Sequence, residues 1–272
     1  MLSKGKFAVI GAGKMGEILI SALLDSGSVK KEQFIATAKH QARIDVISKE
    51  YGVETTLDNA EAVRRANIVL LCVKPQNSIP VLESIRSELT ENKLLISIVT
   101  SLTTAKMEAV LGKSVPVIRA MPNTPALLKA GITALSGGKS AQPADLEKAK
   151  TIFLSVGRAL IVDEHHMDAV TALSASGPAF IFIIIEALAE GGVMVGLPRE
   201  VATELVAQST LGAAKMVLET GKHPALLKDQ VTTPAGCTID GILQMEEGGI
   251  RVTLIKTIVE AARRARELIE ER

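Results

Sequence analysis

Short apolar runs, rich in β-branched residues, recur along the chain as far as residue 163. Because these runs are apolar throughout rather than alternating, they predict strands buried on both faces. The predicted strands cover residues 6–11, 33–38, 67–73, 94–100, 116–121, 132–137 and 159–163. Helical periodicity occupies residues 15–26, 39–50, 58–65, 77–89 and 143–155 between them. Strands that alternate with helices predict an α/β domain with a mostly parallel sheet.

After residue 163 the strand pattern stops and helical patterns replace it. The predicted helices cover residues 163–174, 179–190, 199–219 and 251–270, with Gly191 and Gly192 as a break after the second. We therefore predict an α/β domain over residues 1–162 and an all-α domain over residues 163–272. The helix AFIFIIIEALAE is apolar on nearly every face. It is either the central helix of its domain or is buried against a second subunit.

Charge and composition narrow the classes of partner. The net charge is +1 without a long basic run and aromatic residues make up 2%, which disfavours nucleic acid and anionic membranes. Cys72 and Cys237 lie far apart, so we expect neither a disulfide scaffold nor a zinc site, and a reducing, cytoplasmic location fits. The longest apolar run, PAFIFIIIEALA, contains Glu186 and is too short to span a bilayer, and the N-terminus does not resemble a signal peptide.

The segment GAGKMG places Gly11, Gly13 and Gly16 in the spacing G-x-G-x-x-G, between a predicted strand and a predicted helix. In this context the first glycine makes a tight turn, the second lets the backbone approach a pyrophosphate, and the third lets helix and strand pack closely. The helix N-terminus adds free N–H donors for the phosphates. A glycine-rich turn without a ligand is the alternative, but the alternating pattern favours dinucleotide binding in a Rossmann-type domain.

The end of the second predicted strand bears on which dinucleotide binds. An NAD site usually has Asp or Glu there to bond the ribose 2′-hydroxyl, whereas residues 36–40 of this chain are Ala-Thr-Ala-Lys-His. Thr37 can donate a hydrogen bond, and Lys39 can pair with a 2′-phosphate. These residues favour NADP; the alternative is that Lys39 and His40 only begin a solvated helix.

The segment CVKPQ, residues 72–76, ends the strand predicted over 67–73. The carboxyl ends of strands are where open α/β sheets bind ligands, so Val73 and Pro75 can wall the nicotinamide side of the crevice. The spacing leaves three interpretations of Lys74 open: a general acid, a carboxylate anchor or a surface lysine.

The predicted helical domain offers little acid–base chemistry. The helix over residues 179–190 has no lysine, unlike several hydroxyacid dehydrogenases that carry a lysine base on the interdomain helix. His165 and His166 can supply a base, but they are more simply exposed residues of a helix start. A cyclic imine fits this arrangement, because its protonated form is already electrophilic and needs positioning more than an enzymic acid.

Six motifs lie in order along nearly the whole chain. They are GAGKMG (11–16), CVKPQ (72–76), RAMPNTP (119–125), ALSASGPAF (172–180), STLGAAKM (209–216) and LKDQVTTPAGCTIDGI (227–242). Together they resemble the pyrroline-5-carboxylate reductase family. The resemblance implies a Rossmann domain followed by a helical dimerisation domain, homodimers that can assemble into decamers, and reduction of 1-pyrroline-5-carboxylate to L-proline, the last step of proline synthesis.

In that family the loop equivalent to residues 229–241 binds the substrate carboxylate, largely through backbone N–H groups. The resemblance assigns this role to Val231, Thr233, Gly236 and Cys237. It places the hydroxyl of Thr238 near the ring nitrogen, where it can orient the imine and relay a proton. Glu164 matches a family position near the substrate and can stabilise the iminium charge, or it can serve only as a helix-start carboxylate. The density of Thr, Pro and Gly in this loop argues against a plain connector.

The resemblance also implies a set of cofactor contacts. It maps the phosphate loop to Ile10, Gly11, Ala12, Gly13, Lys14 and Met15, the nicotinamide wall to Cys72, Val73, Lys74 and Pro75, a ribose or adenine contact to Asn59, and backbone contacts to Ile98, Val99 and Thr100. We expect NADPH to be preferred, with NADH as a possible substitute. Ala38 and Gln230 depart from the serine and asparagine of some members, which affects the cofactor preference and not the reaction.

Two rival functions stay open at this level. One is a related reductase of another small cyclic imine or of a β-hydroxyacid, and the missing helix lysine counts against the hydroxyacid. The other is a non-catalytic NADP-binding sensor, which has no need of a carboxylate loop.

Overall fold

A computed structural model describes residues 5–270 of the chain. It divides into two compact units, the first comprising residues 1–175 with the C-terminal stretch from Ala261, and the second Ser176–Glu260. The first unit extends past residue 162 and includes the last part of α12 (Ile250–Glu270). Compact units need not coincide with folding domains, so the domain boundary between residues 162 and 163 stays a prediction.

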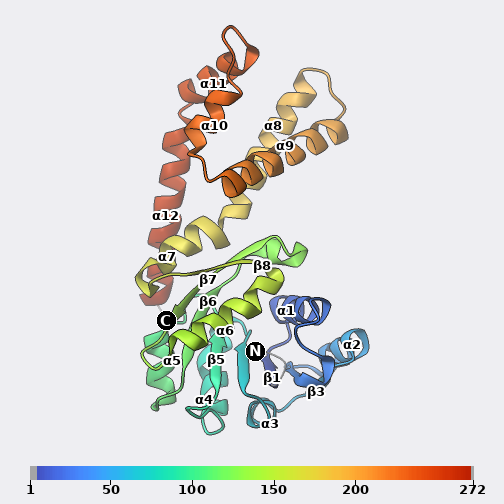
Figure 1. Cartoon of the computed structure of the whole chain (residues 1–272), viewed down its shortest axis with the longest axis vertical. Coiled ribbons are helices and arrows are strands. Elements are labelled where there is room, and N and C mark those ends of the chain that lie inside the picture. The colour runs from blue at the N-terminus through green and yellow to red at the C-terminus, as the bar shows by residue number, and fades with distance from the viewer. Residues whose placement is uncertain (1–4, 271–272) are drawn as a thin grey trace. The chain divides into compact units, whose positions relative to one another are not determined.

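An eight-stranded sheet forms the centre of the first unit (Figure 1). Its strands are β1 (Phe7–Ile10), β2 (Phe34–Thr37), β3 (Glu54–Thr56), β4 (Ile68–Leu71), β5 (Leu94–Ser97), β6 (Val117–Met121), β7 (Gly131–Gly137) and β8 (Gly157–Ile161). The spatial order is β3-β2-β1-β4-β5-β6-β7-β8, and every neighbouring pair is parallel except β6 and β7. The predicted mostly parallel sheet is therefore confirmed.

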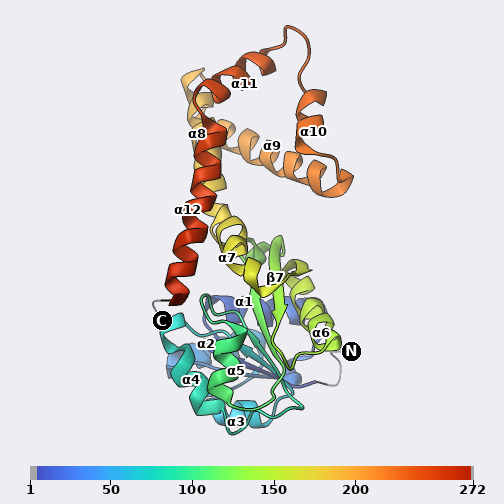
Figure 2. The ribbon, with the colours of Figure 1, turned by 90° about the vertical axis from the view of Figure 1, so that its left-hand side faces the viewer.

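Helices cover both faces of this sheet, as Figures 1 and 2 show. They are α1 (Lys14–Asp25), α2 (Gln41–Tyr51), α3 (Asn59–Arg64), α4 (Ser78–Ile85), α5 (Thr104–Leu111), α6 (Pro143–Phe153) and the short α7 (Met167–Val170). In strands β1, β2, β4 and β5, alternate residues enter two separate cores. Val9 packs with Leu19 and Phe153 from α1 and α6, whereas Ala8 packs with Val63 and Leu82 from α3 and α4. Burial on both faces explains why the strands are apolar throughout.

In the first unit, strand β3 and helix α5 were not expected from the apolar pattern, and neither was α10 (Pro224–Gln230) in the second unit. Strand β3 is three residues long and partly exposed at the sheet edge, so it has no apolar run. Helix α5 is short, but its ends carry recognisable signals: the Thr103 side chain caps it by accepting from Lys106 N, and Gly112 ends it with a φ of 62°. Cap residues would have predicted α5 where periodicity did not.

The second unit is entirely helical. Its helices are α8 (Gly177–Met194), α9 (Arg199–Thr220), α10 (Pro224–Gln230), α11 (Cys237–Glu247) and α12 (Ile250–Glu270), the last of which ends in the first unit. The predicted break at Gly191 and Gly192 is wrong, because α8 continues through both. A Cβ on Gly192 would lie 2.9 Å from the Ala202 Cβ of α9, so that glycine allows two helices to pack closely.

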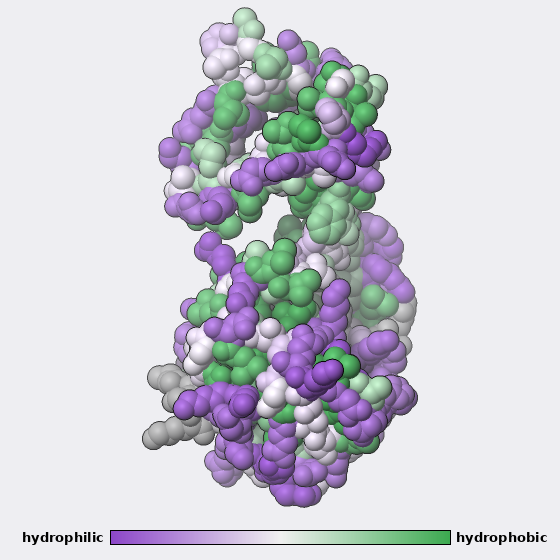
Figure 3. Space-filling view, turned by 90° about the vertical axis from the view of Figure 1, so that its right-hand side faces the viewer, coloured by the Kyte–Doolittle hydropathy of each residue, from purple (hydrophilic) through white to green (hydrophobic). Residues whose placement is uncertain are grey.

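This helical unit buries little of its apolar surface. Among its described residues the buried hydrophobic side chains are Ala189, Ala202 and Leu227. In contrast, Phe182 and Ile183 of α8 are each 64% exposed. Hydrophobic residues gather on the face of this unit seen in Figure 3. An exposed apolar surface of this kind marks an interaction site in a soluble protein.

Candidate active site

The three glycines after β1 have three different surroundings. Gly11 has a φ of 88°, and a Cβ there would lie 2.8 Å from Val73 Cγ1. A Cβ on Gly16 would lie 2.8 Å from the Gly11 carbonyl oxygen, so this glycine lets α1 approach the turn. A Cβ on Gly13 would meet no heavy atom within 4 Å. Gly11 and Gly16 therefore satisfy packing, while Gly13 keeps open space above the loop, as a phosphate-binding turn requires.

Thr37, at the end of β2, holds this loop from the side. Its buried hydroxyl accepts a hydrogen bond from Gly11 N at 3.2 Å and donates one to Asn59 Oδ1 at 2.7 Å. Its carbonyl oxygen accepts from Ala12 N at 2.6 Å. Because the hydroxyl proton is directed to Asn59, Thr37 positions the loop; its direct contact with a cofactor stays a prediction.

Arg43, in the first turn of α2, is a supporting residue that sequence reasoning missed. Its Nε donates to the Ala12 carbonyl at 2.7 Å, and its Nη2 pairs with Glu17 Oε2 of α1 at 2.5 Å. Tyr51 donates to the other oxygen of Glu17 at 3.3 Å, and burial together with the negative charge of Glu17 raises the pKa of Tyr51 to about 12. No local spacing marks Arg43, because its partners lie in the glycine turn and on another helix.

A cavity of about 380 Å³ opens beside the loop and unites predicted cofactor residues from four parts of the chain. Its lining includes Gly11, Thr37, Lys39, Asn59 and Val73. The position at the carboxyl ends of β1, β2 and β4 is that of ligand sites in open α/β sheets. These residues fit a dinucleotide: the open space over Gly13 admits the pyrophosphate, and Lys39 supplies a cation at the ribose end.

The remaining predicted cofactor residues do not line this cavity, but they flank Gly11 and Val73 in the sequence. Ile10 and Ala12 are buried, Lys14 and Lys74 are exposed, and Met15, Cys72 and Pro75 are partly buried. Burial raises the pKa of the Cys72 thiol to about 12, so that thiol is neutral and unreactive at physiological pH. Pro75 lines a second cavity of about 280 Å³ together with Ser101 and Leu102 from the loop after β5. The three interpretations of Lys74 stay open.

The predicted carboxylate loop connects α10 to α11 in the helical unit. Helix α11 begins at Cys237, and no side chain caps its N-terminus at Gly236. Ala235 has a φ of 56°, and Gly236 N donates to the Thr233 carbonyl at 3.1 Å. A Cβ on Gly236 would collide with Thr233 Oγ1, so a larger residue there would have to displace that hydroxyl. An uncapped helix start presents N–H donors of the kind that bind a carboxylate. Val231 directly follows α10, whereas Cys237 and Thr238 are the first two residues of α11.

Glu164 belongs to the first unit and is already engaged. Its Oε1 accepts from Thr104 N at 2.8 Å and pairs with Arg119 Nη1 at 3.3 Å, while its Oε2 accepts from the Thr104 hydroxyl. Arg119 is 2% exposed, and its Nε has no hydrogen-bond partner among the described residues. Sequence reasoning missed Arg119 and Thr104, although Arg119 is the first residue of the RAMPNTP motif.

His165 and His166 match the simpler interpretation. Both are exposed, their ring centroids lie 3.7 Å apart, and His165 Nδ1 lies 2.7 Å from Asp163 Oδ1. Hydrogen bonds from His165 lower the pKa of Asp163, which caps the helical turn that begins at Glu164. Among residues 5–270, no group of three or more His, Cys, Asp or Glu is arranged to hold a metal ion.

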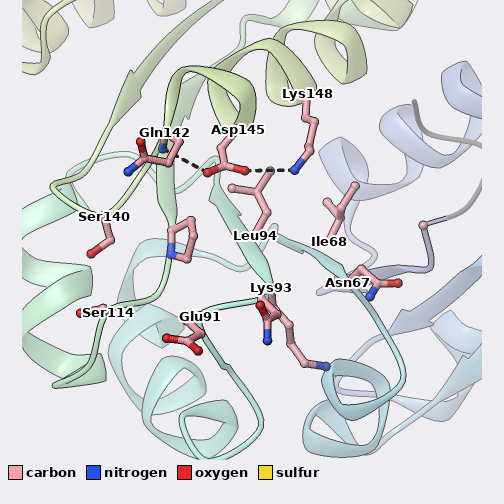
Figure 4. A pocket seen from close by; sticks show the side chains of 13 residues that line it. Asn67, Ile68, Glu91, Lys93, Leu94, Ser114, Ser140, Gln142, Asp145 and Lys148 are labelled. Carbon is pink, nitrogen blue, oxygen red and sulfur yellow. Dashed lines mark hydrogen bonds and ion pairs between the residues drawn. The ribbon is translucent and has the colours of Figure 1, made fainter.

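A larger cavity of about 650 Å³ lies at the opposite, amino edge of the sheet (Figure 4). Three of its charged lining residues, Lys93, Asp145 and Lys148, are paired within the protein. Lys93 donates to the carbonyls of Val63, Arg64 and Ala66 at the end of α3. Asp145 accepts from Gln142 N and pairs with Lys148, each at 3.1 Å. Although this cavity is larger, it lies at the amino ends of the strands, so we assign the dinucleotide to the cavity beside Gly11.

Comparison with known proteins identifies the family. The sequence model for pyrroline-5-carboxylate reductase dimerisation matches residues 164–268, and one described as NADP oxidoreductase coenzyme F420-dependent matches residues 6–101. A pyrroline-5-carboxylate reductase of Methanosarcina acetivorans is 44% identical over 263 residues, which are 97% of each chain. The chain belongs to the pyrroline-5-carboxylate reductase family. The resemblance inferred from the six motifs is confirmed, and with it the prediction of an NAD(P)H-dependent oxidoreductase.

Solved structures of pyrroline-5-carboxylate reductases share the whole architecture. The protein from Coxiella burnetii has a TM-score of 0.93 at 35% identity, with 98% of this chain and 99% of that chain covered. The protein from Plasmodium falciparum, solved with NADP bound, has a TM-score of 0.87 at 29% identity, with coverage of 99% and 100%. The predicted fold class, a Rossmann-type domain followed by a helical dimerisation domain, is confirmed.

The dimerisation match also bears on an apolar helical stretch. By length and composition alone, Glu164–Met194 is long and apolar enough to cross a membrane, which the shorter run considered in the sequence was not. Only 11% of its most apolar window is buried. The same residues lie within the matched dimerisation region, so self-association accounts for their apolar character.

Proposed function

We propose that this protein reduces 1-pyrroline-5-carboxylate to L-proline, using NADPH in preference to NADH. The observation that carries the proposal is the pairing of two sites in one chain. One is a glycine turn with open space over Gly13 beside the cavity of Lys39 and Asn59. The other is an uncapped helix start in a Thr-Pro-Gly loop. A dinucleotide and a small carboxylate are the ligands that these sites fit.

The residues act mainly by positioning. When bound, a reduced nicotinamide supplies the hydride that the imine carbon accepts. The loop of Val231, Thr233, Gly236 and Cys237 holds the substrate carboxylate through backbone N–H groups. Those of Val231 and Gly236 exchange their present acceptors, the carbonyls of Lys228 and Thr233 at 3.1 Å each, for the substrate. The Thr238 hydroxyl orients the ring nitrogen and relays a proton to it, a step that asks little of a weak acid because the imine is readily protonated.

We further propose that the protein is cytoplasmic and forms a homodimer, which can assemble into larger oligomers up to a decamer. The exposed faces of α8, with Phe182 and Ile183 at 64% exposure, support a large apolar interface between copies. The net charge of +1 supports no nucleic acid or membrane partner.

The test is the decrease in NADPH absorbance with pyrroline-5-carboxylate, run beside the same assay with NADH. Fast turnover with NADPH preferred is the expected result. Fast turnover with NADH preferred would keep the reaction and reverse the cofactor preference. If the protein binds NADPH but reduces no small cyclic imine, the proposal fails and a sensor role takes its place.

The role of Thr238 has its own test. Thr238→Ala is expected to lower kcat at least tenfold while the Kd for NADPH stays within twofold, since the hydroxyl acts on the imine and not on the cofactor. Thr238→Ser, which keeps the hydroxyl, is the matched control. Full activity in the alanine variant would remove Thr238 from the mechanism.

A further inference from the structure

The loop between β5 and α5, residues 98–103, is held unusually firmly for an irregular segment. Ile98 N donates to the Leu71 carbonyl at 3.1 Å, and Val99 N donates to Ser97 Oγ at 3.2 Å. Ser101 is buried with a φ of 67°, in the left-handed region that serine rarely adopts. Such a conformation persists where the surrounding structure imposes it, and it is typical of functional segments.

Glu164 accepts hydrogen bonds from Thr104, the residue that follows the C-terminal end of this loop. Both oxygens of its carboxylate contact Thr104, the first residue of α5, one through the backbone N–H and one through the hydroxyl. A carboxylate at a helix N-terminus satisfies a free N–H and opposes the positive end of the helix dipole. Glu164 is 60 residues away in sequence, so this contact joins the start of the dimerisation region to the loop.

Arg119 fixes Glu164 in turn. It lies on β6 beside Ser97 of β5, the last residue before the loop, and its side chain is 2% exposed. A buried guanidinium needs an anionic partner, and Glu164 is the one that the described residues provide. The same carboxylate therefore serves a buried cation and a helix start, which leaves it little capacity to serve a substrate as well.

The loop held in this way faces the nicotinamide half of the expected cofactor site. Ser101 and Leu102 line the cavity of about 280 Å³ together with Pro75, which belongs to the expected nicotinamide wall. We infer that Glu164 is a positioning residue rather than a substrate contact: with Arg119 and Thr104 it fixes the first turn of α5 and thereby the loop 98–103 against the nicotinamide. The role of Glu164 in catalysis rests on the proposed reaction, but its effect on NADPH binding does not depend on that reaction.

Thr104 allows a test that leaves both Glu164 and Arg119 in place. Thr104→Val removes the hydroxyl donor at nearly constant shape, and Thr104→Ser keeps it. We expect Thr104→Val and Glu164→Gln each to raise the Kd for NADPH and lower kcat by about fivefold or more, with the KM for pyrroline-5-carboxylate within twofold. Thr104→Ser should stay within twofold of the parent protein throughout. The double variant should be no worse than the poorer single variant, because both changes break one network.

The opposite pattern would overturn the inference. If Glu164 contacts the substrate, Glu164→Gln raises the KM for the imine, while Thr104→Val leaves kcat and the NADPH Kd within twofold of the parent. Circular dichroism and thermal unfolding of each variant separate a loss of fold from a displaced loop. If Thr104→Val does not fold, Glu164→Gln still decides, because a raised Kd for NADPH with an unchanged KM for the imine supports positioning and the reverse supports a substrate contact. Because the NADPH titration needs no turnover, a parent protein that reduces no imine would refute the proposed reaction and leave this measurement valid.

Discussion

Gly13→Ala separates a role in binding from a role in folding. Gly13 has a φ of −74° and a ψ of −165°, which alanine adopts readily, and the added Cβ would meet no heavy atom within 4 Å. Glycine is somewhat better than alanine at a helix N-cap, but alanine restricts the unfolded chain more. The two effects oppose each other, so the free energy of unfolding should change by less than about 1 kcal/mol.

The cofactor should respond very differently. The same methyl group occupies the space through which the backbone approaches a pyrophosphate, and loss of one charge-assisted N–H···O contact costs about 1.5–3 kcal/mol. The Kd for NADPH should therefore rise roughly 10- to 150-fold.

Gly16→Ala is the matched contrast, because its Cβ would lie 2.8 Å from the Gly11 carbonyl oxygen and must disturb the packing of α1. We expect this variant to lose about 1–3 kcal/mol of stability as well as affinity. Fluorescence titration with NADPH and urea unfolding measure the two quantities. A folded Gly13→Ala protein that binds NADPH within twofold of the parent would refute the phosphate-loop assignment.

Three further changes test other parts of the structure. Thr37→Val removes the acceptor of Gly11 N–H, so NADPH affinity should fall about fivefold, as expected for about 1 kcal/mol, while Thr37→Ser keeps the acceptor and the affinity. Unchanged affinity in the valine variant would count against the role of Thr37 in positioning the loop. The raised pKa values of Cys72 and Tyr51, both about 12, mean that the unfolded chain releases these protons first. The free energy of unfolding should then decrease as pH rises from 9 towards 12, less steeply in Cys72→Ala; parallel pH curves for the two proteins would contradict this. Phe182→Asp should shift the protein to monomers or aggregates in light scattering, and an unchanged dimer would move the interface elsewhere.

The sheet was predictable because its signal is local. Strands β1, β2, β4, β5 and β6 are mostly apolar runs that are buried on both faces, and a parallel sheet with covered faces follows from such runs. Strand β3 pairs only at the edge and needs no apolar run. At Gly192 the local rule failed, because the glycine that usually breaks a helix here lets α8 approach α9.

The residues of the site also divide into those that a local motif predicts and those that only the folded chain reveals. The three glycines and the Thr-Pro-Gly loop are contiguous motifs, so sequence alone locates them. Arg43, Thr104 and Arg119 act on residues 26 to 60 positions away, through contacts that depend on which strands and helices become neighbours. The residues adjacent to Arg43 and Thr104 do not distinguish these side chains from ordinary ones, and the RAMPNTP motif contains Arg119 without indicating its partner. Glu164 was found by resemblance, whereas its partners required the folded chain.

The helical unit links assembly to the chemistry proposed for this chain. Within its described residues only Ala189, Ala202 and Leu227 are buried hydrophobic side chains, although burial of a single large one stabilises a fold by about 1.5–3 kcal/mol. The unit therefore lacks a core sufficient to order it alone, and a second copy offers the apolar surface that completes it. The loop expected to bind the substrate carboxylate lies between α10 and α11 of this same unit. Order in that loop, and with it the geometry of Thr238, should then depend on the dimer.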